Sequence, residues 1–216
     1  MTRPRVLCML DISPHSHVLD GLRRVADVDV QPPCRESLLE RIGACDGYLA
    51  TLEVRLTAEA LDRASRLKVV ATPSTGLDHL DTAELEKRGI WLISIKTEYE
   101  LLDRITATAE MAWALLLAAV RRLPAAHAAA MGGRWARDAF RGRQLSGLTL
   151  GILGVGRLGA MVAAYGRAFR MRVLGCDTKP RRIVAGVKYV DLDTLLRESD
   201  VLSLHIHLTP ENKGLI

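Results

Sequence analysis

The chain has 216 residues, of which 49% are hydrophobic and 25% are charged, and its formal net charge is +5. This composition is typical of a globular protein and excludes a disordered chain. Lysine and arginine are interspersed with nearly as many acidic residues, so no dedicated nucleic-acid-binding surface is indicated. No apolar run reaches the roughly 20 residues of a membrane span, and the start of the chain lacks the apolar run of a signal peptide.

Short apolar runs alternate with longer amphipathic segments over the first half of the chain, which is typical of βα units around a parallel sheet. Ser13 is predicted to cap the first helix, and Asp81 with Glu84 is predicted to form a capping box. Gly89 is expected to end the helix that starts there. The expected strands are residues 5–10, 27–30, 47–51, 67–71 and 90–94. Together they predict a flavodoxin-like unit.

The stretch ITATAEMAWALLLAAVRRLP, residues 105–124, is apolar nearly all round and predicts a helix that is buried on most sides. Pro124 is expected to stop this helix, and the alanine- and glycine-bearing stretch 125–147 is interpreted as a crossover between domains. We therefore expect two domains, residues 1–98 and residues 99–216.

The sharpest local motif is a glycine turn, Gly154-x-Gly156-x-x-Gly159, which follows the apolar run 148–153 and opens a predicted helix over 157–170. Gly154 permits the tight turn, Gly156 lets the backbone approach a pyrophosphate, and Gly159 lets the helix lie close to the strand. The first N–H groups of that helix then face the anion. Alternatively, the three glycines only allow a strand–turn–helix unit to pack tightly.

Asp177 stands at the end of the next predicted strand, eighteen residues after Gly159. An acid in this place accepts hydrogen bonds from the ribose hydroxyls of the adenosine and repels a 2′-phosphate, which favours NAD over NADP. Lys179, Arg181 and Arg182 follow closely, either softening that preference or lying solvated on the surface.

Four segments, in this order and spacing, resemble the D-isomer-specific 2-hydroxyacid dehydrogenases, and most of all their D-3-phosphoglycerate dehydrogenase branch. They are ATPSTGLDHLD (71–81), TATAEMAWALLLAAVRRLP (106–124), LSGLTLGILGVGRLG (145–159) and SDVLSLHIHLTPENKGLI (199–216). The resemblance implies an α/β fold with a flavodoxin-like N-terminal substrate domain, followed by the first half of a Rossmann dinucleotide-binding domain. It also implies NAD as cofactor, hydride transfer to or from a D-2-hydroxy acid, and a homodimer.

The resemblance also implies roles for individual residues. Backbone N–H groups of residues Ser74, Thr75 and Gly76 would hold the substrate carboxylate, and Thr75 would also lie beside the cofactor. The N–H groups of Arg157 and Leu158 would bind the pyrophosphate, while Asp177 would bind the ribose and Ile206 the adenosine half. Two positions depart from the family pattern: His207 stands where proline is usual, and Met111 stands where the long helix usually has histidine.

The family's catalytic Arg, Glu and His come after the segment that ends here with KGLI, so no catalytic residue is expected in this chain. We therefore expect a C-terminally truncated chain that does not turn over substrate alone, with the strand TLGIL (149–153) left as an unpaired apolar edge. Such an edge predicts association through it, a remainder of the protein beyond these residues, or a truncated gene product. The alternative is a non-catalytic NAD-binding or oligomerisation module derived from this family.

The histidines and cysteines are not predicted to take part in catalysis or to bind a metal. His205 and His207 form an H-x-H pair without a third ligand nearby in sequence, so no metal site is predicted. His79 is interpreted as a partner for local backbone. The cysteines Cys8, Cys34, Cys45 and Cys176 include no C-x-x-C pair, which favours a reducing compartment. We expect a cytoplasmic protein that binds neither nucleic acid nor a membrane.

Overall fold

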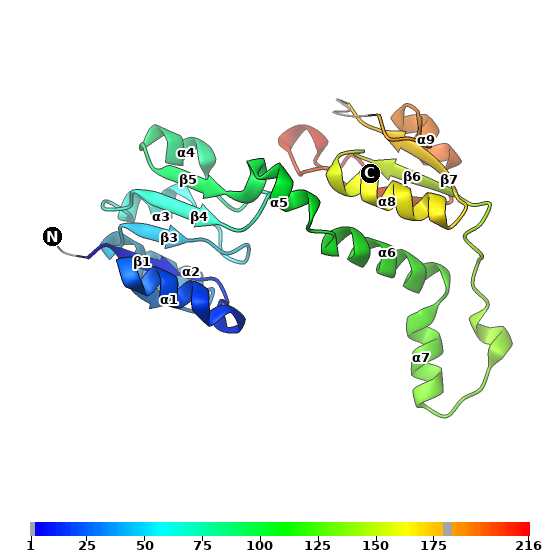
Figure 1. The fold of residues 1–216 in the computed structure, drawn as a ribbon, viewed down its shortest axis with the longest axis horizontal. Helices are drawn as coiled ribbons and strands as arrows, with labels where there is room; N and C mark the ends of the chain where they lie inside the picture. The colour runs from blue at the N-terminus through cyan, green and yellow to red at the C-terminus, as the bar shows by residue number, and fades with distance from the viewer. Residues whose placement is uncertain (1–2, 179–182) are drawn as a thin grey trace. The chain divides into compact units, whose positions relative to one another are not determined.

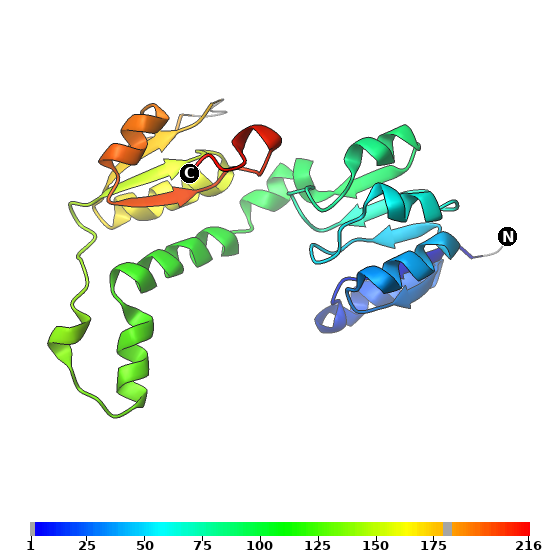
Figure 2. The ribbon, with the colours of Figure 1, turned by 180° about the vertical axis from the view of Figure 1, so that it is seen from behind.

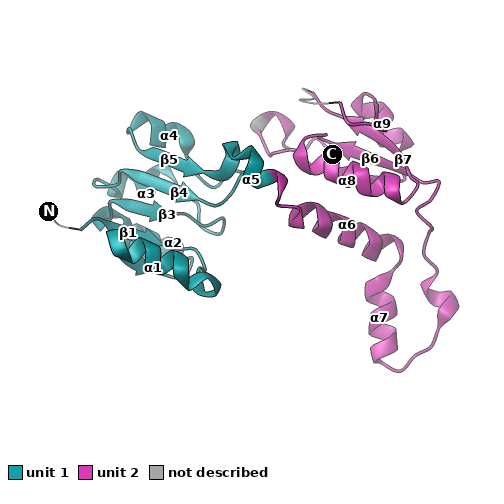
Figure 3. Cartoon of the chain, viewed as in Figure 1, with its two compact units in different colours: residues 1–102 teal, residues 103–216 magenta. Residues whose placement is uncertain are grey.

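The computed structural model describes residues 3–178 and 183–216 (Figure 1). The chain divides into two compact units, Met1–Leu102 and Asp103–Ile216 (Figure 3). The division falls within a short helix, α5 (Tyr99–Asp103). Within the described residues, no single helix has both the length and the apolar character of a membrane span; the segments Tyr99–Val120 and Leu123–Met131 pass that test only as a pair bent by 68°.

The first unit is built on a five-stranded parallel sheet of order β2-β1-β3-β4-β5, which is the order of flavodoxin-like sheets. Its strands are β1 (Arg5–Cys8), β2 (Asp27–Val30), β3 (Gly47–Leu49), β4 (Val69–Thr72) and β5 (Trp91–Ser94). All five expected strands are therefore present, within a few residues of the predicted bounds. Its helices are α1 (Ser16–Val25), α2 (Arg35–Arg41), α3 (Ala58–Arg63) and α4 (Thr82–Lys87).

One face of this sheet forms the core of the unit. Leu7, Tyr48 and Val70 are side by side on β1, β3 and β4 and are fully buried. They belong to one apolar cluster with Leu38 of α2, Leu61 of α3 and Leu85 of α4. The sequence pattern did not indicate α2, because a helix of seven residues spans only two turns and gives too few repeats of the 3.6-residue period.

Local capping in this unit follows the sequence in one case and departs from it in another. The Asp81 carboxylate accepts from the backbone N–H of Glu84 at 3.1 Å, and Gly89 follows the end of α4 with φ of +67°. The predicted capping box is only half formed, because the Glu84 carboxylate pairs with Lys87 and Arg88 and the Asp81 N–H donates to Leu56. Ser13 does not cap α1. Its hydroxyl donates to Asp11 at 2.6 Å, because a short 3₁₀ turn, Ser13–His15, comes before the helix.

The second unit contains a four-stranded parallel sheet of order β8-β7-β6-β9. Its strands are β6 (Thr149–Leu153), β7 (Arg172–Cys176), β8 (Lys188–Tyr189) and β9 (Val201–Leu204), with helices α8 (Arg157–Ala168) and α9 (Leu192–Glu198). This is the 3-2-1-4 portion of a Rossmann sheet.

The prediction that TLGIL is an unpaired edge is wrong. β6 pairs with β7 on one side and with β9 on the other (Figure 2). All five residues of β6 are buried. The reason is topological: after α9 the chain returns past β6 and adds β9 on its far side, so the switch point lies within these residues. The edges of this sheet are β8 and β9.

The long apolar helix also differs from its prediction. It ends at Val120, and the chain bends into a second helix, so the structure has α6 (Ala107–Val120) and α7 (Leu123–Met131). Pro124 does not stop a helix but lies in the first turn of α7, where its missing N–H costs nothing. The stretch interpreted as a crossover is therefore partly helical.

Only one side of α6 is buried. Trp113 packs between Tyr165 and Phe169, with ring centroids 5.9 and 5.1 Å apart, while Met111 and Leu115 are 61% and 63% exposed. In Figures 1 and 2, α6 runs along α8 and α7 stands away from the sheet of this unit. The expectation of burial on most sides is wrong, since a helix that is apolar all round does not reveal which of its sides packs within its own domain.

Candidate functional site

The glycine turn lies between β6 and α8, at the point where the strand order of the second unit reverses. Gly154 has φ of +88°, and a Cβ added there would lie 2.7 Å from the backbone oxygen of His205. A Cβ added to Gly159 would lie 2.1 Å from the backbone oxygen of Gly154. Both glycines are therefore required by the protein's own packing.

Gly156 differs from its two neighbours in the motif. It is the N-cap residue of α8 and has no side chain that could cap the helix, and a Cβ added at Gly156 would meet no described atom within 4 Å. Its φ of −75° is one that any residue adopts. Nothing within the described protein requires a glycine here. The open space beside the first N–H groups of a twelve-residue helix fits an anion bound from outside.

Asp177 follows β7 directly and lies against this turn. Its Oδ2 accepts a hydrogen bond from the backbone N–H of Val155 at 2.8 Å. The carboxylate is thus held beside the opening at Gly156. The three basic residues predicted to influence cofactor choice, Lys179, Arg181 and Arg182, lie outside the described residues.

Arg157 and Leu158 begin α8, so their backbone N–H groups belong to its first turn. The Arg157 side chain turns back and donates from Nη1 to the carbonyl oxygen of Ile105 at 2.7 Å. This bond ties the start of α8 to the segment that leads into α6. On the other side of the turn, Ile206 follows β9 and borders an apolar cavity of ≈ 240 Å³ with Leu153 and Leu208.

The loop expected to hold a carboxylate, residues 74–76, follows β4 at the carboxyl end of the first sheet, which is the edge where parallel sheets bind ligands. The Ser74 hydroxyl donates to the carbonyl oxygen of Gly76 at 2.8 Å. In the described parts of the chain, the backbone N–H groups of Ser74, Thr75 and Gly76 have no acceptor. Three consecutive free N–H groups suit an anion.

The predicted site residues therefore fall into two groups. Ser74, Thr75 and Gly76 lie together in the first unit, and the glycine turn, Asp177 and Ile206 lie together in the second. Sequence reasoning missed the role of Thr72 and misread His79: the imidazole contacts the Thr72 hydroxyl at 3.3 Å rather than local backbone. The sequence signal that could have identified Thr72 was its position as a polar residue at the end of a buried apolar strand.

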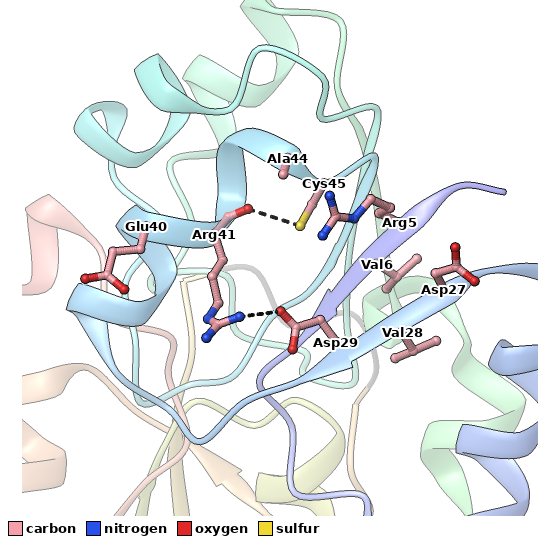
Figure 4. A pocket seen from close by; sticks show the side chains of 9 residues that line it. All are labelled: Arg5, Val6, Asp27, Val28, Asp29, Glu40, Arg41, Ala44 and Cys45. Carbon is pink, nitrogen blue, oxygen red and sulfur yellow. Dashed lines mark hydrogen bonds and ion pairs between the residues drawn. The ribbon is translucent and has the colours of Figure 1, made fainter. Parts of the chain in front are cut away.

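Another cavity, of ≈ 410 Å³, lies beside β1, β2 and α2 in the first unit (Figure 4). Arg41 pairs with Asp29 at 2.9 Å inside it, and the Cys45 thiol donates to the Arg41 carbonyl oxygen at 3.2 Å. Burial raises the pKa of the Cys45 thiol, which disfavours a reactive thiolate. None of the predicted site residues lines this cavity. Across the described ranges, no group of three or more His, Cys, Asp or Glu side chains is placed to hold a metal ion.

The second unit has a glycine turn at the switch point of its parallel sheet, and the first unit has a sheet of flavodoxin-like order. These features define a two-unit α/β protein of the dinucleotide-binding class. Family models agree. The NAD binding domain of D-isomer specific 2-hydroxyacid dehydrogenases matches residues 113–216, and the catalytic domain of the same enzymes matches residues 9–150. The chain belongs to the D-isomer specific 2-hydroxyacid dehydrogenase family.

The relatives of this chain are enzymes named after different substrates. The full chain is 37% identical to a glyoxylate reductase of Aeropyrum pernix and covers 67% of it. A D-3-phosphoglycerate dehydrogenase of Archaeoglobus fulgidus is 36% identical over 84% of this chain and 34% of that protein. The crystal structure of D-lactate dehydrogenase from Aquifex aeolicus, complexed with NAD and lactic acid, matches with a TM-score of 0.81 and 29% identity, over 96% of this chain and 62% of that one.

Two facts follow from these comparisons. The chain spans about two thirds or less of the length of these relatives. The glyoxylate reductase and the phosphoglycerate dehydrogenase are nearly equally similar to it, so the comparisons do not single out the phosphoglycerate branch that the sequence analysis expected.

Proposed function

We propose that this chain is the cofactor-binding and carboxylate-binding part of an NAD-dependent oxidoreductase, which transfers a hydride between NAD and a D-2-hydroxy acid. The observation that carries the proposal is the position of Gly156 at the first turn of α8, because packing among the described residues does not require a glycine there. A pyrophosphate that approaches the backbone closely explains why a side chain is absent there.

In this proposal each group of residues has one task. The N–H groups of Arg157 and Leu158 bind the pyrophosphate, Asp177 orients the ribose, and Ile206 with its apolar surroundings contacts the adenosine half. When bound, the cofactor supplies the site that gives or takes the hydride. The N–H groups of the loop 74–76, which have no acceptor among the described residues, bind the substrate carboxylate, and the family resemblance assigns Thr75 a further contact with the cofactor.

The substrate proposed is a small 2-keto acid or its 2-hydroxy form. Glyoxylate, pyruvate and the oxidised form of D-3-phosphoglycerate all present a carboxylate next to a carbonyl, so the same loop suits each of them. The relatives named above support a panel of these acids without deciding among them.

Titration of the 216-residue chain with NADH, followed by nicotinamide fluorescence, tests the cofactor assignment. We expect saturable binding. We expect no NADH oxidation by this chain with the panel of keto acids, because the resemblance places the substrate-binding cation and the acid–base residue outside it. Absence of NADH binding would overturn the proposed function, and robust turnover would show that the chemistry resides within these residues.

Asp177→Asn is expected to lower the preference for NAD over NADP by about tenfold, because it removes the charge that repels a 2′-phosphate. An asparagine oxygen can still accept from the Val155 N–H, so the turn is retained. The ratio of the two dissociation constants measures the effect. Asp193→Asn, an equal charge change at an exposed position of α9, is the matched control and should leave that ratio unchanged.

The chain is further proposed to form a homodimer through the exposed apolar surface of α6 and α7, which carries Met111, Leu115, Leu123 and Met131. Surface of this kind favours association. Leu115→Glu is expected to raise the dimer dissociation constant by at least about tenfold, as measured by sedimentation. Val18→Glu introduces the same charge at an exposed apolar position of the first unit and should have no effect. An unchanged dimer in Leu115→Glu would remove this surface from the interface.

A cytoplasmic location is also proposed, with small acids as the partners and neither nucleic acid nor a membrane involved. The four cysteines are all free thiols, which supports a reducing compartment.

A further inference from the structure

A line of hydrogen bonds leads from a buried histidine to the candidate carboxylate loop. His79 is only 4% exposed, and its Nε2 lies 3.3 Å from the Thr72 hydroxyl oxygen. The Thr72 hydroxyl lies 2.9 Å from that of Ser74, and the Ser74 hydroxyl donates to the Gly76 carbonyl oxygen at 2.8 Å. The line joins the end of β4 to the middle of the loop.

The direction of every bond in this line is determined by its last member. A carbonyl oxygen only accepts, so the single hydrogen of the Ser74 hydroxyl is used on Gly76. The Thr72 hydroxyl must then donate to Ser74, which uses its own hydrogen. The Thr72 oxygen can therefore only accept from His79, and Nε2 must carry a hydrogen.

The surroundings of the other ring nitrogen, Nδ1, are consistent with a hydrogen on Nε2. Nδ1 of His79 is buried and has no hydrogen-bond partner among the described residues. In a neutral ring with its hydrogen on Nε2, Nδ1 is a bare acceptor, whereas protonation would create a buried N–H without a partner. Burial lowers the pKa of His79; of the charged groups nearby, Asp78 raises this pKa and Arg55 lowers it.

The bond to Gly76 has a consequence for an anion at this loop. A carboxylate held by the free N–H groups of residues 74–76 is repelled by any carbonyl oxygen that turns toward it. The Ser74 hydroxyl occupies the Gly76 carbonyl and keeps it directed at the protein. Loss of the Ser74–Gly76 bond frees this carbonyl to rotate, and loss of either bond behind it removes the contacts that orient the Ser74 hydroxyl toward Gly76.

We propose that His79 is a positioning residue that, as the neutral Nε2–H tautomer, orients the substrate-carboxylate loop through Thr72 and Ser74. Its effect on an anion rests on the proposed function, but the tautomer and the order of the loop do not. Thr72→Val replaces the hydroxyl by a methyl group of similar size and interrupts the line, whereas Thr72→Ser retains it. His79→Gln offers an amide N–H near the place of Nε2, and His79→Leu does not.

Three measurements on the 216-residue chain test the proposal. Nitrogen-15 NMR of the ring should show hydrogen on Nε2 at neutral pH. The amide order parameters of Thr75 and Gly76 should fall from about 0.85 to below about 0.6 in Thr72→Val and His79→Leu, and should stay at the wild-type values in Thr72→Ser and His79→Gln. Glyoxylate, titrated against the amide signals of the loop, should bind about fivefold more weakly to the first two variants.

The pH profile separates positioning from a merely structural role. The order parameters of the loop in wild type should fall as pH decreases through the lowered pKa of His79, because the protonated ring gains a buried Nδ1–H without a partner, and this step should be absent from His79→Gln. A ring with hydrogen on Nδ1, or equal order parameters in Thr72→Val and Thr72→Ser, would overturn the proposal. If glyoxylate fails to shift the loop signals of wild type, the carboxylate assignment of the proposed function fails, while the tautomer and the order parameters still decide the role of His79.

Discussion

Gly156→Val is expected to abolish NAD binding while the second unit stays folded. The added side chain would enter the space beside the first turn of α8, where a Cβ meets no protein atom within 4 Å. The φ of −75° at this residue lies outside the left-handed region that favours glycine. A pyrophosphate must come into van der Waals contact with the same backbone, and the valine methyl groups would occupy its place. We expect the dissociation constant for NADH to rise by at least about 100-fold.

Isothermal titration with NADH and a thermal unfolding curve together check this prediction. The unfolding midpoint should change by no more than about 2 °C, since no packed atom is displaced. Gly21→Val makes the same substitution at a position of α1 that is equally open, and it should leave NADH affinity unchanged. Wild-type affinity in Gly156→Val would refute the assignment of the turn to a dinucleotide.

Gly159→Ala is expected to have the opposite profile, a large loss of stability in the second unit. Its Cβ would lie 2.1 Å from the backbone oxygen of Gly154 and 3.1 Å from the Ile152 side chain. Backbone cannot rotate away as a flexible side chain can, so α8 must move away from β6. We expect the free energy of unfolding of this unit to fall by about 2–4 kcal/mol. NADH binding should weaken as a consequence of the displaced helix.

The emission of Trp113, which is buried between α6 and α8, reports unfolding of the second unit in a background where Trp91 and Trp135 are replaced by phenylalanine. Gly21→Ala is the control, because an exposed helix position should gain up to about 1 kcal/mol from the same substitution. A cost below about 0.5 kcal/mol for Gly159→Ala would mean that α8 is not held against the turn as tightly as the structure indicates.

Features that depend on neighbours in sequence were predicted from the sequence alone. The five strands of the first sheet, the capping interaction of Asp81 with Glu84, and the left-handed Gly89 follow from apolar runs and turn chemistry within a few residues. The glycine turn and Asp177 were recognised in the same way, because their spacing reflects one strand, one turn and one helix. The resemblance to the dehydrogenase family also rests on such contiguous segments.

Features that depend on distant segments were decided only by the tertiary structure. β6 is central because β9, some fifty residues later, returns to its far side, and no local pattern indicates on which side a strand is added. α6 is apolar all round, so its periodicity could not show that only the side of Trp113 packs within its own unit. The line from His79 to Gly76 exists because the loop after β4 folds back on the strand. The direction of these three hydrogen bonds depends on how the loop lies against β4. Composition and residue spacing indicate only the local structure that neighbouring residues favour.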